Sequence, residues 1–95
     1  SGNQNETPGS FYLQQNYPNP FNPVTTIKFG IVKSGNVQIR VYDLARKMVE
    51  ELLNNGYNAA SYDIRRDASE YSSGIYFYSI VTNEFIQTKK MVLVK

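Results

Sequence analysis

The strongest constraint on the fold is the spacing of short alternating apolar runs along the chain. From Phe11 onward, these runs recur about every ten residues and are separated by Gly, Asn and Pro, which is typical of short strands. The longest of them are too short to make stable helices on their own. The sequence therefore predicts an all-β, immunoglobulin-like β-sandwich of about seven antiparallel strands. The chain contains no Cys, so the sandwich must form without a disulfide.

The individual runs indicate which residues face the core. Residues 27–31 and 37–41 alternate apolar and polar side chains, so each run buries one face. The link at residues 34–36, Ser-Gly-Asn, is predicted to be a hairpin turn. Residues 54–56, Asn-Asn-Gly, are predicted to turn the chain after a less regular strand. Residues 75–82 are nearly all apolar, as expected of a central strand, and residues 85–94 form the last strand.

Two tyrosines of the central run have specific expected places. In the spacing Gly74-x-Tyr76-x-Tyr78, Tyr76 occupies the position of the corner tyrosine of immunoglobulin-like sandwiches. Tyr78 occupies the position at which such domains carry the inter-sheet cysteine. We expect both rings in the core together with Phe29 and Tyr62, with the tyrosine hydroxyls reaching the backbone at the rim.

Length and terminal composition predict one domain with a leading linker. Ninety-five residues suffice for a single core, and residues 1–10 are polar throughout. We interpret residues 1–10 as a linker, with Ser1-Gly2 as a remnant of cloning, and residues 11–95 as the domain. No apolar stretch reaches the roughly 20 residues of a membrane-spanning helix, and we expect residues 1–10 not to act as an N-terminal export signal. Direct membrane insertion is therefore not expected.

Charge and residue inventory argue against several classes of function. A net charge of +2 is too small to suggest nucleic acid as a partner. The absence of His and Cys removes the usual zinc ligands and nucleophile pairs, and Glu50 and Glu51 should point to opposite faces of a strand. The spacing of Asp43, Asp63 and Asp67 matches no calcium loop. We expect no enzyme activity, no cofactor and no metal.

The densest local signal is a proline-rich segment. It reads Asn16, Tyr17, Pro18, Asn19, Pro20, Phe21, Asn22 and Pro23. Its prolines remove backbone donors and exclude a helix or a central strand. The segment could be a ligand for a partner, or a stiff loop anchored on the sandwich by Tyr17 and Phe21. The loop is favoured, because two exposed aromatic rings would lower solubility.

The C-terminal strand allows two interpretations. It ends in Thr88-Lys89-Lys90-Met91-Val92-Leu93-Val94-Lys95, with almost no residues beyond the apolar run. The lysines can be charges that protect an exposed sheet edge from aggregation. Alternatively, the strand and the terminal carboxylate form an address that another protein reads by edge pairing or carboxylate capture.

The order of these motifs resembles a known family. The quoted segments are residues 13–29, Val41-Tyr42-Asp43, Ser73-Gly74-Ile75-Tyr76-Phe77-Tyr78 and residues 88–93. Together they resemble the type A C-terminal sorting domain of the type IX (Por) secretion system, over Leu13 to Lys95. The proline-rich string combined with the Lys-Lys-Met-Val-Leu ending is the most specific part of the resemblance.

The resemblance implies a non-catalytic sorting signal at the C-terminus of a larger cargo protein from a Bacteroidota-like Gram-negative bacterium. The implied route passes through the periplasm to the cell surface or extracellular space. The implied partners are the N-terminal cargo domain, the outer-membrane translocon, and a sortase-like surface peptidase that cleaves upstream of Phe11. The residues implied to be recognised are Lys89, Lys90, Met91, Val92, Leu93, Val94 and Lys95. The resemblance implies a structural role for the other family positions, which are residues 16–23, Tyr42, Asp43, Gly74, Tyr76 and Tyr78.

Two departures from the family pattern concern loops. Ala45-Arg46 stands where the family usually has Gly-Arg, which predicts a reshaped or strained turn. Tyr62-Asp63 replaces a usual Trp-Asp or Trp-Asn.

Two other functions remain open: an accessory module that binds carbohydrate or protein through exposed aromatic rings, and a structural spacer that resembles immunoglobulin-like domains of flagellar hook-capping proteins.

Overall fold

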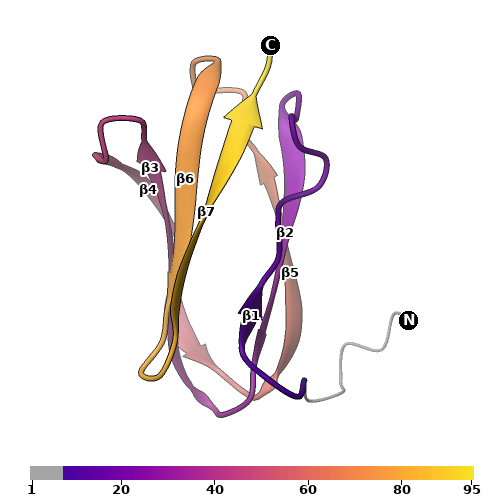
Figure 1. The fold of residues 1–95 in the computed structure, drawn as a ribbon, viewed down its shortest axis with the longest axis vertical. Coiled ribbons are helices and arrows are strands. Elements are labelled where there is room, and N and C mark those ends of the chain that lie inside the picture. Colours follow the sequence, from indigo (N-terminus) through magenta and orange to yellow (C-terminus); the bar gives the residue numbers. More distant parts are fainter. Residues whose placement is uncertain (1–7) are drawn as a thin grey trace.

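Seven strands in two sheets, and no helix, make up the described residues 8–95 of the computed structural model (Figure 1). The strands are β1 (Tyr12–Leu13), β2 (Val24–Ile31), β3 (Gly35–Asp43), β4 (Met48–Tyr57), β5 (Ala60–Asp67), β6 (Gly74–Val81) and β7 (Ile86–Leu93). The sheets have the orders β1-β2-β5 and β4-β3-β6-β7, and all paired strands are antiparallel. Because β2 and β5 face β3, β6 and β7, the predicted immunoglobulin-like sandwich is confirmed.

The core lies between the two sheets, as the alternation predicted. The sandwich buries side chains from both layers because each strand turns every second residue inward. The buried apolar residues are Leu13, Phe21, Ile27, Phe29, Ile31, Val37, Ile39, Val41, Ala68, Tyr76, Tyr78, Ile80, Met91 and Leu93. The strand at residues 75–82 is indeed central, since β6 pairs with both β3 and β7.

The tyrosines take the expected places. The Tyr76 hydroxyl donates to the Ser72 carbonyl at 2.6 Å, which is the contact of a tyrosine corner. Tyr78 is fully buried, and its hydroxyl donates to the Gln14 carbonyl of the opposite layer at 2.7 Å. Tyr62 stacks on Phe29 with ring centroids 5.3 Å apart. Tyr76, Tyr78 and Phe29 are therefore in the core, whereas Tyr62 is half-buried and packs against it. The Tyr62 hydroxyl donates to the Asn58 carbonyl at 2.6 Å.

Two predicted turns are wrong. Residues 34–36 do not close a hairpin, because β2 pairs with β5 whereas β3 pairs with β4 and β6. The link therefore carries the chain from one sheet to the other. Residues 54–56 lie inside β4, where they pair with β3 from Gln38 to Asn36. Gly and Asn residues permit a turn but do not require one, so pairing along β3 extends the strand.

The turn between β3 and β4 has its positive φ at Arg46 and not at Ala45, the residue that replaces the family's Gly. Arg46 has a φ of 69°, in the left-handed region that favours glycine. Its amide donates to the Asp43 carbonyl at 2.9 Å, and the Lys47 amide donates to the Asp43 carboxylate at 2.9 Å. The Arg46 guanidinium lies 5.1 Å from the centroid of the Phe77 ring. Backbone hydrogen bonds and this cation–π contact hold a conformation that Arg disfavours.

The proline-rich loop is anchored by Phe21 but not by Tyr17. Phe21 is 2% exposed, whereas the Tyr17 side chain is 80% exposed, so the expectation that both rings pack inward is wrong for Tyr17. Asn16, its neighbour, turns inward in its place and is 2% exposed. Tyr17 is held through its backbone, which exchanges two 2.9 Å hydrogen bonds with Thr26.

Most of the expected linker lies outside the described residues. Of residues 1–10, the structure describes Pro8, Gly9 and Ser10, which belong to no strand. Among residues 8–95, no helix is long and apolar enough to cross a membrane.

Candidate recognition site at the C-terminal strand

The recognition residues named from the sequence lie on β7 and just beyond it, at the edge of the four-stranded sheet (Figure 1). Their side chains alternate between the core and the surface. Met91 and Leu93 are 2% and 1% exposed, whereas Lys90 and Lys95 are exposed and Val94 is 48% exposed. The structure therefore brings the segment together as one strand, with part of it in the core and part at the surface.

The proline-rich loop lies along the outer edge of this strand. The Phe21 amide donates to the Val92 carbonyl and the Val94 amide donates to the Phe21 carbonyl, each at 2.9 Å. The side-chain oxygen of Asn19 accepts from the Val92 amide at 3.0 Å. These contacts form a short parallel bridge between Phe21 and Leu93. Two motifs that are about seventy residues apart in sequence therefore form one structural unit.

A second contact extends this edge. The Gln15 side-chain amide donates to the Lys90 carbonyl at 2.6 Å. In a strand, the backbone N–H and C=O groups of every second residue point to the same side. The backbone groups of Ile86 and Thr88 therefore point away from β6, like those of Lys90 and Val92. Among residues 8–95, neither Ile86 nor Thr88 has a backbone partner on that side. The half of the edge next to the C-terminus is covered, and the other half is open.

The covering loop is held from inside the sandwich by Asn16. Its side-chain amide donates to the Pro18 carbonyl at 3.1 Å and to the Thr25 hydroxyl at 3.0 Å. The Thr25 hydroxyl in turn donates to the Pro18 carbonyl at 3.0 Å. Asn16 and Thr25 are both buried, and within the described residues no buried side-chain polar atom lacks a partner. A satisfied buried network of this kind fixes the start of the loop.

Tyr78 completes the network from the opposite sheet. Its hydroxyl accepts from the Asn16 backbone amide at 2.7 Å while it donates to Gln14. Burial raises the pKa of Tyr78 to about 12, and the hydrogen bond from Asn16 opposes that rise. The hydroxyl is therefore protonated at neutral pH and able to donate. The strand next to β7 thus supports the loop that covers β7.

The last residue contacts a third segment. The Lys95 side-chain nitrogen donates to the Ser69 carbonyl at 2.5 Å, in the link between β5 and β6. Gln15 and Ser69 were not singled out from the sequence as residues that contact the C-terminus. No local pattern marks them, because their partners lie 75 and 26 residues away.

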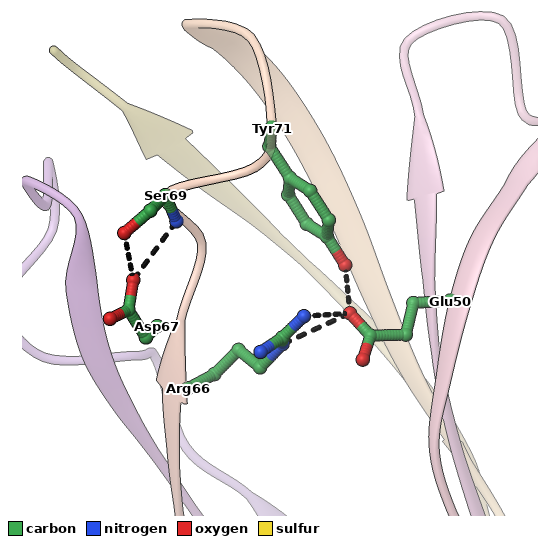
Figure 2. Close-up of polar contacts among 5 residues, drawn as sticks. All are labelled: Glu50, Arg66, Asp67, Ser69 and Tyr71. Carbon is green, nitrogen blue, oxygen red and sulfur yellow. Dashed lines mark hydrogen bonds and ion pairs between the residues drawn. The ribbon is translucent and has the colours of Figure 1, made fainter.

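A polar group at the same end of the molecule connects the two sheets (Figure 2). Arg66 on β5 donates twice to Glu50 on β4, at 3.0 and 2.6 Å. The Tyr71 hydroxyl donates to the same carboxylate oxygen, and burial, followed by that hydrogen bond, raises the pKa of Tyr71 to about 12. Glu51 instead pairs with Arg40 on its own sheet at 2.8 Å. The prediction that Glu50 and Glu51 point to opposite faces is confirmed.

The adjacent Asp67 is engaged with its own turn. Its carboxylate accepts from the backbone amide of Ser69 at 3.0 Å and from the Ser69 hydroxyl (Figure 2). These side-chain and backbone hydrogen bonds lower the pKa of Asp67. Within the described part of the chain, no three His, Cys, Asp or Glu side chains are grouped so that they could hold a metal ion.

The remaining family positions support the strands. Tyr42 is half-buried on the outer face of β3, and Asp43 accepts the backbone donors of the next turn. Gly74 opens β6, opposite Leu93 at the end of β7. All thirteen Tyr and Phe residues lie within the described chain, and Tyr17 alone among them is in the exposed class. The other twelve rings are buried or half-buried in the described chain.

Fold and site together define a class of protein: a small β-sandwich whose C-terminal strand lies at a sheet edge and is bridged there by the chain's own proline-rich loop. A family model described as "Secretion system C-terminal sorting domain" matches residues 15–95. The chain belongs to this family, the C-terminal sorting signals of type IX secretion, which is a non-catalytic domain family. Such a signal implies export to the cell surface or extracellular space in Bacteroidota.

A solved structure supports the fold. The crystal structure of dimeric latent PorU from Porphyromonas gingivalis matches with a TM-score of 0.65 and 20% sequence identity. The match covers 92% of this chain and 10% of the PorU chain, so this chain spans about a tenth of that protein. Among curated proteins, no sequence matches this chain.

Proposed function

We propose that residues 89–95 are the part of this sorting domain that the secretion machinery reads. The observation that carries the proposal is the position of β7 at a sheet edge, with Lys90, Val94 and Lys95 exposed at its end. The exposed side chains of Lys90, Val94 and Lys95 are accessible to a partner. The outward backbone groups of Lys90 and Val92 already bind the proline-rich loop and Gln15, so in this proposal the partner reads side chains rather than pairing with the strand edge. Met91 and Leu93 fix the segment by packing in the core.

The proposed partners follow from the type IX role of the family. An outer-membrane translocon recognises the domain after its cargo has reached the periplasm. A sortase-like surface peptidase then cuts upstream of Phe11, in the linker, and attaches the cargo at the cell surface. The cargo domain supplies the activity of the whole protein. In this proposal, residues 11–95 form the sorting unit and residues 1–10 the linker.

Exposed residues at the end of β7 provide the test. Deletion of residues 89–95 would remove Met91 and Leu93 from the core, so loss of export would also follow from unfolding. Lys90→Glu changes only an exposed side chain, whereas a chain that ends at Leu93 also loses the Val94 hydrogen bond to Phe21 and the Lys95 contact with Ser69. The 95-residue chain is fused behind a periplasmic signal peptide and a fluorescent cargo in a host with the type IX system. Surface fluorescence per cell is then measured.

We expect both variants to lower surface delivery, while the purified Lys90→Glu domain keeps its unfolding midpoint. The shortened chain should unfold at a lower midpoint, because it loses two hydrogen bonds. Lys47→Glu is the matched control, because Lys47 is an exposed lysine outside the segment. Wild-type surface delivery by both β7 variants would contradict the assignment of residues 89–95. An equal loss with Lys47→Glu would show that the export step senses overall charge rather than this segment.

A further inference from the structure

We propose that the proline-rich loop, residues 17–23, is a clamp that positions the C-terminal strand for recognition, and that Asn16 is the residue that holds the clamp in place. This inference rests on the proposed function of residues 89–95 and adds the elements that keep those residues in register. It gives a specific role to the proline-rich motif, which the sequence predicts to be a structural loop.

The clamp works through backbone pairing on the side of β7 that no strand covers. Phe21 exchanges two hydrogen bonds with Val92 and Val94, and Asn19 accepts a third from the Val92 amide. Without the loop, these groups would lie at an open edge and the last residues would lose their partners. The contact with Val94 lies beyond the end of β7 at Leu93, so pairing with β6 does not substitute for it.

Asn16 determines where the clamp begins. Its amide binds the Pro18 carbonyl and the Thr25 hydroxyl in a site that solvent does not reach. Apolar residues could not replace these bonds, since the Pro18 carbonyl would lose a buried donor. Phe21 then enters the core as the second anchor, five residues further along the chain. Between these two anchors, the loop presents Asn19 to the Val92 amide.

Positioning favours recognition because it removes conformational freedom before a partner arrives. A partner that binds a flexible terminal segment must order it, and that ordering opposes binding. A segment already held in extended form, with Lys90 and Lys95 outside and Met91 inside, avoids most of this loss. The clamp therefore strengthens the signal rather than hiding it.

The first test measures the clamp in the purified domain. Asn19→Ala removes the acceptor for the Val92 amide, whereas Asn19→Asp keeps an oxygen at the same place. Asn22→Ala is the matched control, because Asn22 is exposed in the same loop and no side-chain hydrogen bond of Asn22 is among those of the described residues. We expect hydrogen exchange of the Val92 amide to rise roughly tenfold in Asn19→Ala only, as loss of one hydrogen bond implies. Exchange of the Met91 amide, which faces β6, should not change.

The second test measures delivery of the fluorescent cargo with the same three variants. We expect lower surface fluorescence with Asn19→Ala and wild-type values with Asn19→Asp and Asn22→Ala. Asn16→Asp, which turns a donor into an acceptor, should lower both exchange protection and delivery further. The Asn19 variants keep the test decisive if Asn16→Asp does not fold.

Each outcome has a defined meaning. Unchanged exchange at Val92 in Asn19→Ala would overturn the clamp. Faster exchange combined with unchanged or increased delivery would overturn its positioning role. If Lys90→Glu and the chain ending at Leu93 are exported normally, the proposed function fails, while the exchange experiment still decides whether the clamp exists.

Discussion

At the scale of single residues, Tyr78 connects the two layers where many immunoglobulin domains carry a disulfide. Its hydroxyl donates to the Gln14 carbonyl and accepts from the Asn16 amide, so one atom satisfies two backbone groups of the opposite layer. A chain without cysteine thereby obtains a specific inter-sheet link at the centre of its core. The link is polar, and it depends on a protonated hydroxyl.

Tyr78→Phe should therefore lower the free energy of unfolding by about 1–3 kcal/mol, because a buried amide and carbonyl lose their partner. Urea unfolding monitored by circular dichroism provides the measurement. Tyr17→Phe removes the same atom from a side chain that is 80% exposed and should change stability by less than about 0.5 kcal/mol. Equal effects of the two substitutions would show that the buried hydroxyl contributes nothing specific.

The same hydroxyls predict a loss of stability in alkali. Burial raises the pKa of both Tyr78 and Tyr71 to about 12, from 10.0 for an unperturbed tyrosine. The unfolded chain ionises first, so stability from these groups is complete below pH 10 and falls as the pH rises toward 12. Urea unfolding between pH 9 and pH 11.5 measures this slope, which should be smaller in Tyr78→Phe. A slope that is the same in both proteins would exclude Tyr78 as a source.

At the scale of elements, strand existence was predictable and strand pairing was not. Alternating apolar residues marked β2 and β3, because burial of one face follows directly from the period of a strand, and a nearly continuous apolar run marked β6. The residues at 34–36 suit either a hairpin or a crossing between sheets, and only distant partners decide between them. The loop that covers the edge of β7 could not be predicted for the same reason, since Asn19 and Val92 are 73 residues apart in the sequence. The burial of Asn16 in place of Tyr17 also depends on these contacts.

The short strand β1 depends on one glycine of its neighbour. Tyr12 pairs with Gly30, and a Cβ atom at Gly30 would lie 2.2 Å from the Tyr12 ring. Gly30→Ala should displace that ring, break its 2.9 Å hydrogen bond to Ser61 and destabilise the protein by about 1–3 kcal/mol. Thermal unfolding measures the change.

Gly56→Ala is the control for this substitution, because no atom lies within 4 Å of its would-be Cβ and its φ is not in the left-handed region. It should leave the unfolding temperature unchanged or raise it slightly, since alanine restricts the unfolded chain. A neutral Gly30→Ala would mean that Tyr12 moves aside freely and that β1 is not anchored by this contact.

At the scale of the whole molecule, the two sheets are joined by polar contacts as well as by the core. Glu50, Arg66 and Tyr71 come from β4, β5 and the following link, and they meet at one open side of the sandwich (Figure 2). The pair is partly shielded, with the side chains of Arg66 and Glu50 27% and 32% exposed. Three donors on one carboxylate oxygen distinguish this group from an ordinary surface ion pair.

Glu50→Gln should lower the free energy of unfolding by about 1–2 kcal/mol, as the charge-assisted bonds to Arg66 weaken. Glu51→Gln removes a similar charge that pairs with Arg40 within one sheet, and it should lower stability by less than about 1 kcal/mol. Urea unfolding at low and high salt distinguishes the two. Equal losses would indicate that the contact between sheets adds nothing beyond an exposed ion pair.

The stacked rings of Phe11 and Phe85 place the beginning of the folded unit beside the turn between β6 and β7, with centroids 5.6 Å apart. The strand β7 has eight residues and is therefore about 25 Å long, and Lys95 lies two residues beyond its far end. A bulky passenger attached ahead of Phe11 and a receptor that grips Lys95 would approach from opposite poles. The size of the passenger would then place little steric limit on docking, so one such tail could serve proteins of very different dimensions.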